Sequence, residues 1–356
     1  MGSSCWSPIY YERGQVDLAY SKRALFSIII PVYNAQSTII RLLTSIKKQK
    51  FDDYEVVMVI DGATDNSERV IKEFIIQNNL MNTWSCYTQN NSGVSAARNY
   101  GMSIAKGRYI LFCDADDVVD LDLMNCISQK IADDAEKDDI IFFGKTNIKN
   151  GNIDSIDTIS ETKTVKIGAE YFEKLLKNNL LPTTWNKAIR RSFVGKTIFK
   201  DIPAGEDYEF YLDLLMKKPC ISIINRPLYY YDTSSENSIM HSYHPERTKT
   251  FIRQKEKVNQ LLGLFQADEE TLRRINFENN ADCLDRIVTN LFREGVHVPL
   301  SLRYQELKNA NKYFPICGEF MGNLARSKRV KVKLAGSINP GKFAVLVMLY
   351  MIKDHC

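Results

Sequence analysis

The run Phe26–Val32, FSIIIPV, constrains the fold of this chain most strongly. Strands of parallel sheets are covered on both faces, so their sequences are nearly continuous apolar, β-branched runs. Tyr54–Ile60 is a second such run, and Trp84–Thr88 and Tyr109–Cys113 are predicted to be shorter strands. Segments with apolar residues at helical spacing lie between these strands. Four strands alternating with three helices predict a doubly wound α/β domain.

Length and composition narrow the class of protein. The chain has 356 residues, whereas a single core stops growing at about 250–300 residues, so we expect one large domain with an addition, or two domains. The net charge of +4 does not indicate a nucleic-acid partner. The eight cysteines are scattered without a CxxC pair, which argues against a zinc site and favours the reducing cytoplasm. Residues 1–24 are an N-terminal extension without a signal-peptide pattern.

The pattern is less regular after the fourth predicted strand. A helix is expected over 121–127, and the acidic stretch 133–139 is expected to be a solvated turn. Asn150–Asn152 predicts a hairpin turn. Residues 168–192 are predicted to be helical, as is most of 245–314.

The C-terminal tail, 326–356, joins a basic cluster to an apolar run. Five Lys and Arg residues lie within Arg326–Lys333, and the ten residues Phe343–Ile352 are apolar and flanked by lysines. A bilayer-spanning helix needs about 20 residues. The tail therefore predicts either a helix at an anionic membrane surface or a C-terminal core helix, and the neighbouring basic cluster favours the membrane.

Three carboxylates follow the fourth predicted strand, in Asp114-Ala115-Asp116-Asp117. Ligands of α/β sheets bind at the carboxyl ends of the strands. Carboxylates this close repel one another unless a cation lies among them, and oxygen ligands suit Mg²⁺ or Mn²⁺. The alternative is a polar turn that caps the next helix. Taken alone, the segment supports both interpretations equally.

Five motifs stand in an order that resembles the family 2 glycosyltransferases: FSIIIPVYN, VIDGATDNS, NNSGVSAARNYG, YILFCDADD and AGEDYEF. The resemblance implies an α/β GT-A fold, an inverting mechanism and a nucleotide-diphosphate sugar as donor, with UDP as the expected nucleotide. The expected organisation is an extension (1–24), a GT-A domain with a doubly wound mixed sheet (25–240), a helical C-terminal region (241–325) and the basic, apolar tail (326–356).

The resemblance also implies which residues bind the donor. The implied nucleotide-sugar-binding residues are Pro31, Val32, Tyr33, Asp61, Arg98, Asp114 and Ala115. The nucleoside would lie on the first three, Asp61 would accept hydrogen bonds from the base or ribose, and Arg98 suits diphosphate oxygens. The family usually has two acids at the end of the second strand. Ile60 stands where the first is expected, which leaves the choice of nucleotide open.

The resemblance assigns the metal and the base to different motifs. Asp116, in the DxD motif, is implied as the ligand of an Mn²⁺ or Mg²⁺ ion that bridges the two phosphates. Asp117 would cap the next helix or order the surroundings of the metal. Asp207 is implied as the catalytic base for the acceptor hydroxyl. Glu206 would hold the loop or raise the basicity of its neighbour.

Two further features stay open at this point. His241 and His244 lie where some relatives have another metal ligand, but a solvated histidine is the default. Trp185 either stacks on an acceptor sugar or packs in the core.

The sequence therefore predicts an inverting, metal-dependent glycosyltransferase of bacterial surface polysaccharide biosynthesis. The acceptor would be a hydroxyl of a polyprenyl-linked glycan at the inner face of the cytoplasmic membrane. One alternative is a catalytically inactive nucleotide-sugar-binding module. The other is a sugar nucleotidyltransferase, but that class has a glycine-rich loop after the first strand, which PVYNAQS lacks.

Overall fold

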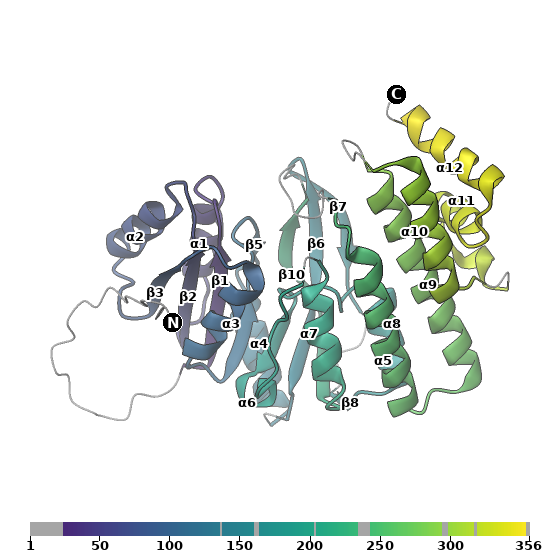
Figure 1. Ribbon diagram of the computed structural model, residues 1–356. Helices are drawn as coiled ribbons and strands as arrows, with labels where there is room; N and C mark the ends of the chain where they lie inside the picture. The colour runs from purple at the N-terminus through teal and green to yellow at the C-terminus, as the bar shows by residue number, and fades with distance from the viewer. Residues whose placement is uncertain are drawn as a thin grey trace, which may run out of the picture. The chain divides into compact units, whose positions relative to one another are not determined.

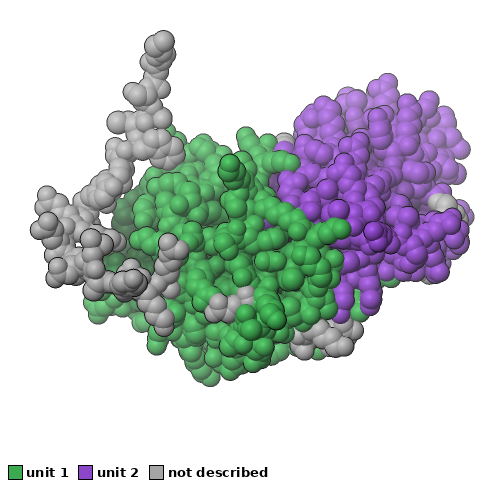
Figure 2. All heavy atoms as spheres, turned by 90° about the horizontal axis from the view of Figure 1, so that it is seen from below, with its two compact units in different colours: residues 1–167, 174–201, 217–234 green, residues 168–173, 202–216, 235–356 purple. Residues whose placement is uncertain are grey.

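The computed structural model describes residues 24–135, 137–159, 164–202, 204–233, 243–293, 298–316 and 319–353. These residues form two compact units that are interleaved along the chain. Unit 1 consists of the described parts of 1–167, 174–201 and 217–234, and unit 2 of those of 168–173, 202–216 and 235–356 (Figure 2). The extension 1–24, apart from Ala24, and His241 lie outside the described residues. The domain ranges expected from the sequence remain predictions.

Unit 1 contains a mixed sheet with ten strands among the described residues, in the order β3-β2-β1-β4-β9-β6-β10-β5, with β7 beside β6 and β8 beside β10 (Figure 1). The strands are β1 (Phe26–Val32), β2 (Tyr54–Asp61), β3 (Trp84–Gln89), β4 (Tyr109–Phe112), β5 (Val118–Val119), β6 (Ile140–Lys149), β7 (Asn152–Asp157), β8 (Val165–Lys166), β9 (Lys187–Arg190) and β10 (Cys220–Asp232). The four predicted strands β1 to β4 are adjacent and parallel, as expected.

Helices cover both faces of the parallel part of the sheet. The helices that begin in unit 1 are α1 (Ile39–Lys47), α2 (Ser67–Gln77), α3 (Val94–Ile104), α4 (Leu123–Asp133) and α6 (Arg191–Val194). In β2, Met58 and Ile60 belong to the core that contains residues of α1, α2 and α4. Val57 and Val59 pack with Ala97 of α3 on the opposite face. This arrangement explains why the strand is apolar without alternation, and it confirms the doubly wound fold.

Two expectations for the middle of the chain were wrong. Residues 168–192 are not continuously helical, because β9 lies between α5 (Ala169–Lys177) and α6. Its Ala188 and Ile189 are buried where β9 pairs with β4 and β6, and periodicity alone does not distinguish so short an apolar run from a helix. The acidic stretch 133–139 is not wholly solvated either, since Asp138 is completely buried. The hairpin turn is confirmed, with Asn150 at φ +51° between β6 and β7.

Unit 2 is helical, as predicted for the C-terminal region. Its helices are α7 (Glu206–Leu215), α8 (Arg247–Leu264), α9 (Glu269–Leu291), α10 (Leu300–Tyr313), the 3₁₀ helix η2 (Met321–Asn323), α11 (Arg326–Ala335) and α12 (Pro340–Lys353). One core joins five of them through Phe251 of α8, Leu284 of α9, Leu307 of α10, Ala335 of α11 and Leu346 of α12. None of the helices among the described residues has the length and apolarity needed to cross a bilayer.

Candidate active site

Asp117 anchors the acidic loop that follows β4. It is completely buried, and its carboxylate accepts hydrogen bonds from the Tyr229 hydroxyl (2.8 Å) and the Asp232 N–H (3.0 Å), both of β10. The same hydroxyl accepts a hydrogen bond from the Asp114 N–H at 3.0 Å. Asp117 does not cap the next helix, because β5 intervenes and the N-cap of α4 is Asp122. Its role in the structure is to order the loop.

Asp116 lies among other acids. Burial, followed by the charges of Asp114 and then Asp232, raises the pKa of the Asp116 carboxyl. Arg41 of α1 donates a hydrogen bond to the Asp116 carbonyl oxygen (2.6 Å) and pairs with the Asp232 carboxylate (3.0 Å). A divalent cation would stabilise the ionised form of a carboxylate crowded by like charges. The oxygen donors of this loop therefore fit Mn²⁺ or Mg²⁺.

The acids do not make a complete cation cage by themselves. Within the described part of the chain, no group of three or more His, Cys, Asp or Glu side chains is arranged to hold a metal ion. Mg²⁺ usually keeps several waters and binds one or two carboxylates together with substrate phosphates.

Arg98 of α3 positions the first acid of the loop. Its side chain is 4% exposed, and one guanidinium nitrogen lies 3.2 Å from a carboxylate oxygen of Asp114. The guanidinium also stacks 5.4 Å from the ring centre of Phe199. Asn99 holds that ring in place, because its side-chain amide donates to the Phe199 carbonyl and accepts from the Phe199 N–H, both at 2.8 Å. A fixed Arg–Asp pair thus lies at the carboxyl end of β4.

Asp61, at the end of β2, is bound to protein donors. Its carboxylate accepts hydrogen bonds from the Gln89 side chain and from the N–H groups of Ser92 and Gly93, each at 2.8 Å. These bonds close the loop that leads into α3. Gly62, at φ +65°, allows the close approach, since a Cβ atom there would lie 2.6 Å from the Asn91 nitrogen.

The end of β1 presents an aromatic side chain on a braced loop. Pro31 and Val32 continue the strand, and Tyr33 follows it with 53% of its side chain exposed. The loops after β1 and β2 are joined where the Asn34 side-chain oxygen accepts the Thr64 N–H at 2.8 Å. An exposed ring on such a loop suits stacking against a nucleoside.

Trp185 packs in the core of unit 1 and supports the acidic loop through its contact with Tyr229. It is 3% exposed and lies between the rings of Tyr229 (centroid distance 4.4 Å) and Tyr231 (5.1 Å). The Lys145 ammonium lies 5.2 Å from its ring centre. Core packing, one of the two sequence interpretations, therefore describes Trp185, and the stack orients the hydroxyl that holds Asp114 and Asp117. Ala115 is partly buried against the same core.

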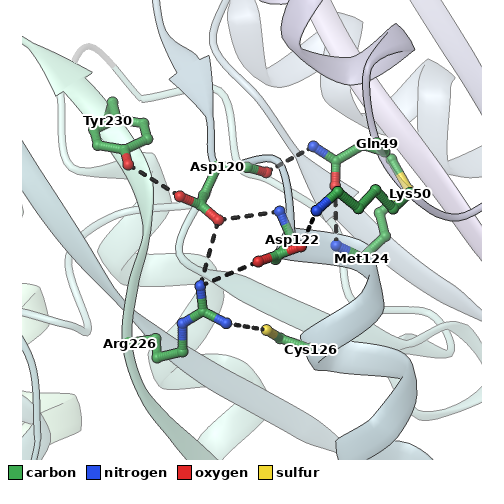
Figure 3. A network of polar contacts seen from close by, with 8 residues as sticks. All are labelled: Gln49, Lys50, Asp120, Asp122, Met124, Cys126, Arg226 and Tyr230. Carbon is green, nitrogen blue, oxygen red and sulfur yellow. Dashed lines mark hydrogen bonds and ion pairs between the residues drawn. The ribbon is translucent and has the colours of Figure 1, made fainter.

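A second polar network anchors the segment between the acidic loop and α4 (Figure 3). The Asp120 carboxylate accepts a hydrogen bond from the Tyr230 hydroxyl at 3.0 Å and lies 3.7 Å from Arg226. The Asp120 carbonyl accepts a bond from the Gln49 side chain (2.6 Å), whose oxygen accepts the Met124 N–H (3.1 Å). The acidic loop is therefore fixed at both of its ends.

Glu206 and Asp207 belong to unit 2, in the first turn of α7. Their helix follows Gly205, at φ +84°, whose carbonyl accepts a hydrogen bond from Gln254 of α8 at 2.8 Å. The buried Glu209 pairs with basic side chains of α8 at 2.7 and 3.2 Å. Glu206 and Asp207 are both partly buried at the end of a helix where acidic side chains are favoured. His244 has its backbone fixed by Asn290 in the same unit.

Residues 27–198 match the family described as Glycosyl transferase family 2. This part of the chain belongs to that family. The family 2 segment contains the loops after β1 and β2, Arg98 and the acidic loop.

Curated relatives resemble the family 2 segment over part of their length. The glycosyltransferase GlyG of Streptococcus pneumoniae is 32% identical over 120 residues, which are 34% of this chain and 38% of that protein. The cholesterol galactosyltransferase of Borreliella burgdorferi is 26% identical over 219 residues, 57% of this chain and 58% of that protein. The chain thus spans less than two thirds of either relative.

Solved structures confirm the GT-A fold. Residues 1–349 of TarS from Staphylococcus aureus, in complex with UDP-GlcNAc, superpose with a TM-score of 0.65 and 19% identity over 92% of each chain. A mannosyltransferase from Pyrobaculum calidifontis, in complex with GDP-Man and Mn²⁺, superposes with a TM-score of 0.52 and 14% identity, over 97% of this chain and 91% of that chain.

Three residues around the acidic loop were not found from the sequence: Arg41, Tyr229 and Asp232. Arg41 lies in a segment with apolar residues at helical spacing, and Tyr229 and Asp232 lie in none of the five motifs. Tyr229 and Asp232 come more than a hundred residues after the family 2 segment's acidic loop, and β10 reaches it only through the strand order of the sheet. No pattern in the sequence around the acidic loop therefore indicated that these residues would contact it.

Proposed function

We propose that this chain is an inverting, metal-dependent glycosyltransferase of bacterial surface polysaccharide biosynthesis. It transfers a sugar from a nucleotide-diphosphate donor, in the first instance a UDP-sugar, to a hydroxyl of a glycan acceptor. The observation that carries the proposal is the acidic loop of the family 2 segment, in which Arg98 pairs with Asp114 and Asp116 lies among acids. One relative supports it, because TarS is named a poly(ribitol-phosphate) beta-N-acetylglucosaminyltransferase and is solved with UDP.

The donor would lie along the carboxyl ends of β1, β2 and β4. In this proposal Tyr33 stacks on the nucleoside and Asp61 keeps the adjoining loop closed around it. Arg98 faces the diphosphate while it orients Asp114, which contacts the ribose or the sugar. An Mn²⁺ or Mg²⁺ ion held by Asp116 would act as a Lewis acid that neutralises the leaving nucleotide diphosphate.

Asp207 would act as the base. As the acceptor oxygen attacks the anomeric carbon, its proton passes to the Asp207 carboxylate, and the bond to the diphosphate breaks on the opposite face of the sugar. One displacement of this kind inverts the configuration at the anomeric carbon. Glu206 would hold the first turn of α7 or, through its negative charge, raise the basicity of Asp207.

The C-terminal tail, 326–356, supports the proposal that the acceptor lies at a membrane. On α12, Leu346 is buried in the core of unit 2, whereas Val345, Met348 and Leu349 are exposed. One of these exposed residues, Leu349, lines a groove of about 620 Å³ together with Arg326, Ser327, Val330, Lys331 and Tyr350. An apolar face edged by cations suits the interface of an anionic bilayer. We therefore place the enzyme at the cytoplasmic membrane, with a polyprenyl-linked glycan as acceptor.

A thermal-shift screen of nucleotide sugars, with and without Mn²⁺, tests the proposal. A ligand at a hundredfold excess over its dissociation constant raises the free energy of unfolding by about 2.7 kcal/mol. We expect one nucleotide series to raise Tm only when Mn²⁺ is present. Asp116→Asn should remove this metal dependence, and Asp154→Asn, at an exposed position of β7, should retain it. No response to any nucleotide sugar would contradict the proposal.

A further inference from the structure

Three arginines gather in unit 2 around the start of α8. Arg247 is the first residue of α8 and is only 8% exposed. Arg286 is exposed on α9, and Arg293 lies two residues after the last residue of that helix, Leu291.

Asn290 of α9 holds the backbone of His244, three residues before Arg247, through two hydrogen bonds of 3.0 Å, so the start of α8 lies beside this end of α9. Helices α8 and α9 pack together in the core of unit 2, where Phe251 of α8 and Leu284 of α9 lie. Leu284 is two residues before Arg286.

The electrostatics of Arg247 are unfavourable without a ligand. Burial, followed by the positive charges of Arg293 and Arg286, lowers the pKa of Arg247 to about 10. Among the residues that the structure describes, no hydrogen bond or ion pair is made by the Arg247 side chain. Buried charges are almost always paired, because the cost of removing them from water must be offset.

Glu246 is the N-cap of α8 and directly precedes Arg247. Its carboxylate pairs with Lys249 at 2.8 Å and compensates the positive end of the helix dipole, so the dipole does not contribute to an anion site here.

The Tyr208 hydroxyl is a further group without a partner. It is buried and makes no hydrogen bond within the described residues. Burial raises the pKa of this hydroxyl, and the positive charge of Arg286 opposes the rise. A buried hydroxyl without a partner costs about 1–3 kcal/mol unless a ligand or water satisfies it.

We infer that Arg247, Arg286, Arg293 and the Tyr208 hydroxyl form a binding site for a phosphate group of the acceptor. Guanidinium groups match phosphate oxygens in shape and charge, and a phosphate dianion or diester would offset the mutual repulsion of the arginines. The inference rests on the proposed function in one respect. Tyr208 directly follows Asp207, the proposed base, so an anion bound here belongs to the acceptor, whereas the donor diphosphate is assigned to unit 1.

Binding of inorganic phosphate to the full chain tests the site independently of catalysis. The titration is followed by calorimetry without divalent cations, in chloride buffers of equal ionic strength, with and without saturating UDP. We expect Arg247→Gln and Arg286→Gln each to weaken phosphate binding about tenfold or more, since a charge-assisted hydrogen bond is lost. Arg273→Gln, at an exposed position of α9, should bind phosphate like the wild type. UDP should leave the phosphate affinity unchanged.

Equal phosphate affinity in the three variants, or no binding to the wild type, would overturn the site. Thermal stability gives a second readout that a purely structural arginine would not produce. In chloride buffer, Arg247→Gln should raise Tm, because it removes a buried, repelled charge. In phosphate buffer this advantage should disappear, since the wild type gains stability from the ligand. A lower Tm of the variant in both buffers would show that Arg247 stabilises the fold and does not bind phosphate.

The acceptor assignment is tested separately with phosphate-bearing and neutral glycans. Arg286→Gln should raise KM for the phosphate-bearing acceptor about tenfold and leave KM for the donor and for neutral acceptors unchanged. If the variant loses inorganic phosphate binding but keeps its acceptor KM, the site binds free phosphate and the assignment to the acceptor is wrong. Failure of the proposed function alone would appear as absent UDP binding with phosphate binding intact.

Discussion

At the scale of residues, the acidic loop depends on one hydroxyl group. The Tyr229 hydroxyl accepts the Asp114 N–H and donates to the Asp117 carboxylate, and stacking against Trp185 fixes its ring. Two of the three acids of the motif are thus bound to the same atom. The remaining acid, Asp116, is the one whose carboxylate is left for a cation in the proposed mechanism.

Tyr229→Phe should destabilise the protein and loosen this loop. The substitution leaves a buried carboxylate and an N–H group without their partner, which costs about 1–3 kcal/mol. Urea denaturation measures the change in the free energy of unfolding. Tyr33→Phe removes a hydroxyl from a largely exposed side chain and should change stability by less than about 0.5 kcal/mol. Equal effects of both substitutions would show that the hydroxyl bridge contributes nothing.

Asp138, which lies just before β6, should make the free energy of unfolding depend on pH. Burial, followed by the charge of Asp134, raises its pKa from 3.8 to about 6. The folded state therefore binds this proton more tightly than the unfolded chain. Its contribution is fully present below about pH 4 and is lost as the pH rises to about 6.

Asp138→Asn should remove this pH dependence. We expect the variant to exceed the wild type in free energy of unfolding by roughly 1–3 kcal/mol at pH 7.5, but not at pH 4. Urea titrations of both proteins at the two pH values measure the difference. A difference that is the same at both pH values would show that Asp138 does not titrate as described.

At the scale of elements, the parallel strands and their helices were predictable because the apolar pattern of each segment indicates which of its faces are buried. An apolar run without alternation requires cover on both faces, and the structure supplies it. The strand β9 was not predictable, since KAIR contains only two buried apolar residues and becomes a strand through its neighbours β4 and β6. Burial of Asp138 likewise depends on distant segments that pack around it.

The packing of α3 on β1 gives a test at this scale. A Cβ atom on Gly101 would lie 2.4 Å from a methyl group of Ile29, whereas one on Gly263 of α8 would meet nothing within 4 Å. Gly101→Ala should therefore destabilise the protein by about 1–3 kcal/mol through overpacking. Gly263→Ala should stabilise it by up to about 1 kcal/mol, because alanine favours the helix. Denaturation curves in which both variants change alike would contradict this packing.

The exposed face of α12 should determine membrane binding. Removal of residues 326–356 is a poor test, because Ala335 and Leu346 belong to the core of unit 2. The double variant Met348→Ser/Leu349→Ser changes only exposed side chains. It should bind anionic vesicles at least about tenfold more weakly in sedimentation assays, whereas Ile156→Ser, on the exposed face of β7, should bind normally. Undiminished binding of the double variant would remove this face from the membrane interface.

At the scale of the whole molecule, the family and the fold followed from motifs that are local in sequence. Residues of the first four motifs lie at the end of a strand or the start of a helix of unit 1, so their order predicts the edge of the sheet on which they meet. The partners of the acidic loop were not predictable, because Tyr229 and Asp232 reach it through the order β4-β9-β6-β10. The arginine site of unit 2 was hidden for the same reason, since Arg247 and Arg286 lie on different helices.

The Asp207→Asn variant tests the central claim most directly, because it separates donor binding from sugar transfer. We predict that the variant binds the nucleotide sugar and Mn²⁺ within about threefold of the wild-type affinity. Its rate of transfer should fall by a factor of about 10²–10⁴, the contribution of a positioned general base. Calorimetry and nucleotide-diphosphate release measure the two quantities on the same preparation. Transfer at the wild-type rate would contradict the assignment of the base and the mechanism built on it.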